Sequence, residues 1–314
     1  MRPFVAAWRR GSGPGEFNSF AVLGWVADTM WVADIRQYRT SFFGPDLKLL
    51  RTTAWPQTPT AISAAERIGY FFPAAILPDG STLGEGLLMP TSEERGPSRG
   101  SATARRSSTG ALTILVRRPP DEDAPWMMWV SGLGQIVPFA LQPQRVYDAR
   151  RFAELTAPIP TRQEGTFNVT VISSSGDTVY ARRYPFRGLA IPQSAKDSAA
   201  ASFLGRGTEG PVDTPRRFQA LAHERMPSWY IPVETITLGL DRTVWIGLRP
   251  TVEGRSYLVL NASGDPVGTV VVPRSTRVRQ ARADRIWVTE TDNDGLSSVV
   301  RYRVAGLQCG RPGC

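Results

Sequence analysis

Histidine and cysteine, which most often build metal and nucleophilic sites, are almost absent from this sequence of 314 residues. His223 is the only histidine, and both cysteines, Cys309 and Cys314, fall in a tail that contains Gly and Pro. Zinc sites and Cys–His catalysis need clusters of these side chains, and no G-x-S-x-G turn is present to hold a nucleophilic serine. The sequence therefore predicts no catalytic residue, no metal site and no cofactor, and it predicts that His223 is a solvated or hydrogen-bonded histidine on a helix.

Acidic residues offer a second route to chemistry. Residues 292–295, Asp-Asn-Asp-Gly, resemble the start of a calcium loop, but the later Glu is missing at the required spacing, which favours a tight turn. Asp34 and Glu290 each follow a Trp-Val step. We expect these two carboxylates to accept hydrogen bonds from a turn of a neighbouring repeat, and the alternative is that they bind a ligand.

Two other motifs have structural interpretations. The Gly-Ser-Gly-Pro-Gly run at residues 11–15 could suggest a phosphate cradle, yet no lysine and no helix follow it, so the run predicts a turn. We expect the tryptophans Trp25, Trp31, Trp245 and Trp287 to pack between structural elements and not to serve as stacking platforms.

The net charge of +9 and the pI near 10.1 raise the question of nucleic-acid binding. Two of the 37 basic residues are lysines, Lys48 and Lys196, and the other 35 are arginines scattered along the chain. Scattered arginines favour a solvated surface over a dedicated site, so nucleic acid is an unlikely partner unless the fold gathers a basic stripe on one face. The chain has neither an apolar run of about 18 residues nor the core of a signal peptide.

The elements that position these residues are short strands. Between residues 11 and 53 the chain has a glycine-rich lead and then apolar runs separated by turns, which predicts a four-stranded antiparallel meander. This stretch resembles the NHL repeat, although Leu47 stands where the repeat has a turn glycine. The residues that match the repeat are Gly11, Gly13, Gly15, Phe17, Trp31, Val32, Asp34, Arg39 and Phe42.

The same order of strands returns further along the chain. Residues 233–273 form a second copy with Trp245 in the position of Trp31, and a third copy from Thr276 has Trp287 there. Two more units have a weaker pattern. One consists of residues 66–77, 111–117 and 126–130, and the other lies within residues 152–184. The chain resembles the bacterial six-bladed β-propeller proteins of unassigned function that carry diverged NHL-type repeats, and this resemblance implies six blades where we identify five units.

We therefore predict an all-β fold, a propeller of five or six four-stranded antiparallel blades with a short helical insertion at about residues 188–229. The C-terminal unit supplies only three strands, so residues 4–8 are expected to pair with residues 299–304 and leave no free edge. Residues 1–307 are predicted to form a single domain, and residues 308–314 a flexible tail. Helices are expected at residues 194–204 and 214–226, and residues 91–109 are expected to form an exposed loop.

The absence of a catalytic group favours a noncatalytic binding or interaction protein that uses the loop face and channel mouth of the propeller. The alternative is a propeller enzyme resembling metal-assisted lactonases or lyases. That alternative needs two or three carboxylates to converge at the channel mouth, drawn from Asp34, Glu85, Glu253, Glu290 and Asp292.

In a meander blade, the links from second to third strand and from the last strand to the next blade leave on the same side. The helical insertion and the loops after Asp34, Arg249 and Glu290 should therefore share one face. The residues expected to bind a protein or a small polar or anionic ligand there are Asp34, Arg36, Arg249, Arg255, Glu290, Arg216 and Arg217. We expect a monomer without a membrane span, cytoplasmic as written, or periplasmic or secreted if the N-terminus is truncated.

Overall fold

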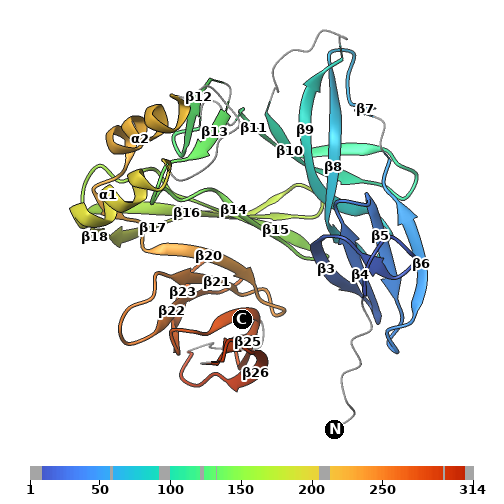
Figure 1. Ribbon diagram of the computed structural model, residues 1–314. Coiled ribbons are helices and arrows are strands. Elements are labelled where there is room, and N and C mark those ends of the chain that lie inside the picture. The colour runs from blue at the N-terminus through green and yellow to red at the C-terminus, as the bar shows by residue number, and fades with distance from the viewer. Residues whose placement is uncertain are drawn as a thin grey trace. The chain divides into compact units, whose positions relative to one another are not determined.

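The computed structural model describes residues 9–56, 59–91, 100–120, 124–131, 133–204, 213–292 and 294–307. The chain forms two compact units, coloured by residue number in Figure 1. Unit 1 contains residues 1–120, 147–151 and 174–176, and unit 2 contains residues 121–146, 152–173 and 177–314.

The first sheet of unit 1 is an antiparallel meander of β3 (Phe20–Val26), β4 (Thr29–Asp34), β5 (Arg39–Phe43) and β6 (Leu49–Ala54). Trp31 lies in the second strand, buried and directly opposite Gly24. A Cβ atom at Gly24 would lie 2.6 Å from the Trp31 ring, so the glycine makes room for the indole. Trp31 is therefore a packing residue, as the sequence predicts.

The glycine-rich lead forms a loop between β1 (Arg9–Arg10) and β2 (Glu16–Phe17), which pair in parallel. The turn before β6 contains Leu47, whose φ of 60° lies in the left-handed region that favours glycine. Leu47 nevertheless packs against the buried cluster of Phe17, Met30, Val32 and Phe43. At this position, where the NHL repeat has glycine, leucine makes the turn less favourable but adds an apolar side chain to the buried cluster.

The second sheet of unit 1 corrects one expectation. It contains β7 (Thr60–Ala61), β8 (Glu66–Ile76), β9 (Thr82–Pro90), β10 (Ser101–Arg106) and β11 (Leu112–Arg118). The expected loop over residues 91–109 is therefore wrong for β10, and residues 92–99 lie outside the described part of the chain. Ala102 and Ala104 are buried, and because such small side chains carry little apolar signal, the alternating pattern of a strand is hidden in the sequence.

Three further sheets lie wholly or mostly in unit 2 and follow the same antiparallel order. The third sheet contains β14 (Gln144–Tyr147), β15 (Arg151–Thr156), β16 (Glu164–Ser173) and β17 (Thr178–Arg187). The fourth contains β20 (Val233–Leu238), β21 (Val244–Leu248), β22 (Arg255–Leu260) and β23 (Pro266–Val272). The fifth contains β24 (Arg277–Arg282), β25 (Arg285–Thr291) and β26 (Ser297–Arg303). Trp245 and Trp287 both lie in second strands, as expected.

Alternation along β16 shows how the strands bury one face. Phe167, Val169 and Val171 are buried in a cluster that also contains Val244 and Ile246 of the fourth sheet. Because successive side chains of a strand point to opposite faces, the intervening Thr166, Asn168 and Thr170 lie on the other face. The core thus lies between the third and fourth sheets of unit 2.

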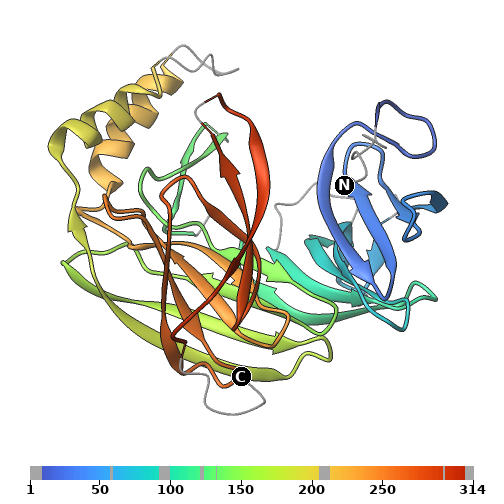
Figure 2. The same ribbon diagram turned by 90° about the horizontal axis from the view of Figure 1, so that it is seen from below.

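The helical insertion carries α1 (Gln193–Ala201) and α2 (Thr214–Arg225), as expected, between the short paired strands β18 (Leu189–Ala190) and β19 (Trp229–Tyr230). Figures 1 and 2 show the two helices side by side next to the β12 (Met127–Val130)–β13 (Leu133–Ile136) hairpin. Residues 126–130 therefore do not belong to a blade. The hairpin and the helices share one apolar core because both leave the sheets and must bury their own apolar faces. The buried members of this core are Met128, Val130, Val137, Ala200, Phe203, Phe218, Ala222 and Met226.

The fold is thus an all-β propeller of five blades with two helices in the described residues, which confirms the predicted fold class. The five sheets correct the six blades that the resemblance implies. The fifth blade has three described strands, while the predicted closing segment, residues 4–8, and the tail, residues 308–314, lie outside the described residues. The single domain over residues 1–307 stays a prediction.

Candidate functional site

Asp34, the first predicted ligand-binding residue, is fully buried in unit 1. Its Oδ2 accepts hydrogen bonds from the backbone N–H of Asn18 (2.7 Å) and from the side chain of Gln37 (2.9 Å), and its Oδ1 accepts from the backbone N–H of Arg36 (2.9 Å). Burial by itself raises the pKa of Asp34, but these and neighbouring backbone N–H groups together hold that pKa below its ordinary value. The carboxylate is committed to the loop that it holds, while the side chain of Arg36 is exposed.

Arg39 completes the same loop. Its guanidinium donates to the carbonyl oxygens of Ser12 (3.1 Å), Gly13 (2.7 Å) and Glu16 (2.6 Å). The motif that resembles an NHL repeat therefore fixes the glycine-rich lead against β4 and β5. The expected hydrogen bonding to a turn is present at Asp34, although the turn belongs to the same blade and not to a neighbour.

Arg249 and Arg255 lie in unit 2, at the end of the fourth sheet where the insertion enters. The Arg249 guanidinium lies 4.1 Å from the ring centroid of Tyr230 in β19, and this places Arg249 at the base of the insertion. Arg255 is buried and forms an ion pair with Glu234 at 2.7 Å. A ligand at Arg255 would have to compete with this ion pair, whose Glu234 side chain is partly exposed, and ligand binding by Arg255 stays a prediction.

Glu290 lies at the corresponding end of the fifth sheet. Its Oε1 accepts from the Tyr302 hydroxyl at 2.5 Å and lies 3.4 Å from the Thr276 hydroxyl. The bond to Glu290 raises the pKa of Tyr302. First strands β20 and β24 lie side by side, and Leu240, after β20, donates to the Ala281 carbonyl in β24. The two strands therefore run in the same direction. As a result, Glu290 in the fifth sheet lies at the same end of the blades as Arg249 and Arg255 in the fourth sheet.

Arg216 and Arg217 are exposed on α2. Arg217 is within 3.5 Å of the Ser131 hydroxyl in the β12–β13 hairpin. In unit 2, Arg249, Arg255 and Glu290 therefore lie at the same end of the blades as the helical insertion. Asp34 and Arg36 belong to unit 1.

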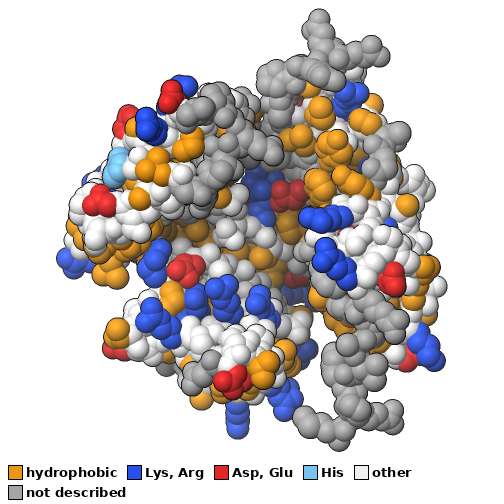
Figure 3. All heavy atoms as spheres, viewed as in Figure 1, with side chains coloured by type: hydrophobic (Ala, Val, Ile, Leu, Met, Phe, Trp, Pro, Cys, Tyr) orange, Lys and Arg blue, Asp and Glu red, His pale blue; other side chains and the backbone are white. Residues whose placement is uncertain are grey.

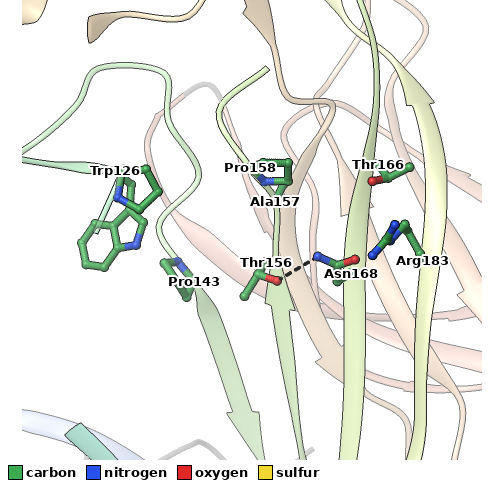
Figure 4. A pocket seen from close by; sticks show the side chains of 9 residues that line it. Trp126, Pro143, Thr156, Ala157, Pro158, Thr166, Asn168 and Arg183 are labelled. Carbon is green, nitrogen blue, oxygen red and sulfur yellow. Dashed lines mark hydrogen bonds between the residues drawn. The ribbon is translucent and has the colours of Figure 1, made fainter. Parts of the chain in front are cut away.

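A cleft of about 510 Å³ in unit 2 lies beside these elements and was not predicted. Figure 4 shows Trp126 at one side, Thr166 and Arg183 at the other, and Thr156 and Asn168 between them. The cleft is completed by the backbone and side chains of Pro125, Pro143, Ala157 and Pro158. Its volume falls within the range of small-molecule sites.

The polar residues of the cleft form a row across three strands. Asn168 of β16 lies directly opposite Arg183 of β17, so their side chains share one face of the sheet. The Asn168 amide donates to the Thr156 hydroxyl of β15 at 3.5 Å. Arg183 is exposed, and its guanidinium makes no ion pair or hydrogen bond with the other described residues. The cleft therefore offers an uncommitted guanidinium next to an amide and two hydroxyls.

A second hollow of about 810 Å³ continues from the cleft, and the two share Pro158 and Thr166. It brings Arg162 and Arg187 into the same surface, with Phe186 and Glu164. The strand pattern of residues 164–171 could have indicated this polar face. No pattern in the sequence could have placed Trp126 beside this face, because it directly precedes a separate hairpin, β12–β13.

The carboxylates that a metal-assisted reaction would need are engaged or dispersed. Glu85 accepts a hydrogen bond from Tyr147, whose pKa is raised by burial and by Glu85 itself. Asp292 accepts from the N–H groups of Asp294 and Leu296 in a tight turn, as expected. Glu253 is exposed in the loop before β22. Within the described ranges, no group of three His, Cys, Asp or Glu side chains is placed to hold a metal ion.

His223 is exposed on α2, which agrees with the predicted solvated histidine. Neither described helix has the length and apolar character needed to cross a membrane.

Comparison with known proteins finds no matching protein-family model and no matching curated protein. Among solved structures, the chain is similar to a member of the DUF4221 family from Bacteroides vulgatus, with 12% identity over 93% of this chain and 81% of that chain and a TM-score of 0.43. It is also similar to the calcium-binding protein regucalcin from Agrobacterium tumefaciens, with 11% identity, 94% and 95% coverage and a TM-score of 0.30. An exo-β-1,3-galactanase from Phanerochaete chrysosporium matches with 10% identity, 95% and 63% coverage and a TM-score of 0.37. Identities and scores this low assign no family, ligand or activity to the chain.

Proposed function

We propose that this protein is a noncatalytic binding protein that holds a small anionic ligand in the cleft of unit 2, beside the helical insertion. The observation that carries the proposal is the row of Thr156, Asn168 and Arg183, which faces Trp126 across the cleft. Arg183 is exposed, and Thr156 and Asn168 are half-buried. Polar groups that reach solvent on a rigid sheet, next to loops and an insertion, are typical of binding sites grafted on a scaffold.

The side chains indicate the chemistry of the ligand. A guanidinium binds a carboxylate through two parallel hydrogen bonds. The amide of Asn168 and the hydroxyls of Thr156 and Thr166 can each donate and accept, which suits a ligand with hydroxyl groups. An indole offers a flat apolar surface against the ring of such a ligand. A sugar acid combines these features, so glucuronate is a suitable probe and glucose is its uncharged counterpart.

Calorimetric titration of the purified protein with these two probes tests the proposal. Glucuronate should bind, glucose should bind more weakly, and Arg183→Ala should lower the affinity for glucuronate by about tenfold to a hundredfold, since hydrogen bonds to charged groups contribute about 1.5–3 kcal/mol. Arg182→Ala is the matched control, because the adjacent Arg182 lies on the opposite face, 3.6 Å from Asp265. Equal affinity in the Arg183 variant and the natural protein would contradict the proposed site.

A further inference from the structure

The fifth sheet gathers arginines from three separate stretches of the sequence onto one face. In an antiparallel sheet, residues paired across strands share a face, and residues two apart along a strand share it as well. The register of β24, β25 and β26 therefore assigns every side chain to a face. One face, which we call the arginine face, consists of three cross-strand rows and one bulge residue, Arg279. The rows are Arg277–Thr289–Val299, Gln280–Trp287–Arg301 and Arg282–Arg285–Arg303.

Behind the arginine face, side chains of β24 and β25 form an apolar, buried layer. Val278, Ala281, Ile286 and Val288 belong to the core cluster that also contains Trp245 of the fourth sheet. The arginine face is thus held rigidly by the packing behind it. Figure 3 shows basic side chains, in blue, over the part of unit 2 formed by β20–β26, and all of them are arginines because this stretch contains no lysine.

Most of these arginines are uncommitted. Arg277, Arg282, Arg301 and Arg303 are exposed and make no ion pair or hydrogen bond with other side chains of the described residues. The other two have partners. Arg279 donates to the Thr289 hydroxyl at 3.1 Å, and Arg285 pairs with Asp284 at 2.6 Å.

Trp287 occupies the centre of the arginine face. It is half-buried and lies outside the core cluster behind the sheet, so it does not pack between elements as the sequence predicts. Its cross-strand neighbours are Gln280 and Arg301. An aromatic ring surrounded by guanidinium groups on an open sheet surface can stack on an unpaired base while the arginines contact the backbone phosphates. Gln280 adds an amide that can donate to and accept from the edge of a base.

We propose that the arginine face of β24–β26 binds single-stranded nucleic acid. A duplex would present phosphates to the arginines but would keep its bases stacked away from Trp287, so the central aromatic favours a single strand. Arginines scattered along a chain make nucleic acid an unlikely partner unless the fold gathers them into a basic stripe on one face. The register of the fifth sheet meets that condition.

Fluorescence anisotropy with a labelled single-stranded oligothymidylate, measured over a series of salt concentrations, tests this site. Arg301→Ala and Arg303→Ala should each weaken binding and reduce the slope of log affinity against log salt by about 0.7, the value for one phosphate contact to a single strand. Trp287→Leu should weaken binding by about tenfold, and Trp287→Phe should retain most of the affinity because it keeps a stacking ring. Circular dichroism should show the same fold for each variant.

Two controls show whether binding belongs to the arginine face and whether it requires bases. Arg162→Ala and Arg187→Ala remove the same charge from the hollow beside the cleft and should leave oligothymidylate binding unchanged, so the result does not depend on the proposed cleft ligand. Dextran sulfate supplies a polyanion without bases. If it binds as tightly as oligothymidylate and Trp287→Leu changes neither affinity, the face is a general polyanion surface and the proposal is wrong. Undetectable oligothymidylate binding at low salt would also overturn it.

Discussion

Asp34 shows how the fold uses a carboxylate that looks available in the sequence. A buried carboxylate that accepts several N–H groups is stabilising, and its removal leaves buried donors without partners. The same reasoning separates Arg255, which is committed to Glu234, from Arg183, which is not. The proposed binding residue therefore differs from Arg255 in having no partner among the described residues, and not in its charge.

Replacing the Asp34 carboxylate by an amide should destabilise the folded protein. Asp34→Asn should lower the free energy of unfolding by about 2 kcal/mol at neutral pH, because the new amide faces N–H donors. The folded state holds the pKa of Asp34 below its ordinary value of 3.8. Its stabilisation is therefore complete above that value and is lost as the pH falls through the lower folded pKa.

Urea unfolding at several pH values measures this difference. The difference in free energy of unfolding between the natural protein and Asp34→Asn should become smaller at acid pH. Asp28→Asn, which changes an exposed carboxylate of the same sheet, should have little effect at any pH. A gap that widens on acidification would falsify the assignment.

At the scale of elements, the helical insertion is a small layer with its own core. The insertion buries Phe203, just after α1, and Phe218 of α2 against Met128 and Val130 of the β12–β13 hairpin. The two phenylalanine rings stack with their centroids 5.9 Å apart. Trp126, which forms one side of the cleft, directly precedes this hairpin. The packing of the helices on the β12–β13 hairpin therefore also helps to position Trp126 at the side of the cleft.

Truncating the centre of this layer should loosen it. Phe218 is fully buried, and Phe218→Ala should cost about 3–5 kcal/mol of local stability. Limited proteolysis should then cut within the insertion, while the β signal in circular dichroism remains. Arg216→Ala, an exposed change on the same helix, should leave the proteolysis pattern unchanged. Equal protease resistance in both variants would show that the insertion does not depend on this core.

At the scale of the molecule, the chain passes repeatedly between the two compact units. It crosses from one to the other after residues 120, 146, 151, 173 and 176. A unit that is formed from several separated segments cannot unfold as a simple terminal piece. The predicted single domain over residues 1–307 therefore has a thermodynamic test.

Differential scanning calorimetry should give one cooperative transition, and Asp34→Asn in unit 1 should shift that whole transition to lower temperature. Phe218→Ala in unit 2 serves as the comparison, since it should act first on the insertion. Two separate transitions, only one of which moves in the Asp34 variant, would mean that the units unfold independently and that the single-domain prediction is wrong.

The amino-acid sequence alone was enough to predict the repeated strands, the positions of Trp31, Trp245 and Trp287 in second strands, and the two helices. These features are local, because alternation, turn residues and helix limits are encoded within a few neighbouring residues. Strand β10 was not predicted, because its buried residues Ala102 and Ala104 are too small to give a clear apolar alternation.

Which side chains meet could be known only from the folded chain. Thr156, Asn168 and Arg183 form one row, and Arg277, Trp287 and Arg303 share one face, because strand register sets neighbours that are far apart in the chain. The sequence shows that a carboxylate such as Asp34 exists, but not that four N–H groups occupy it. Whether a polar side chain is free to bind a ligand depends on hydrogen-bond and ion-pair partners that other elements supply. The fold could therefore be predicted from local patterns, but the sites could not.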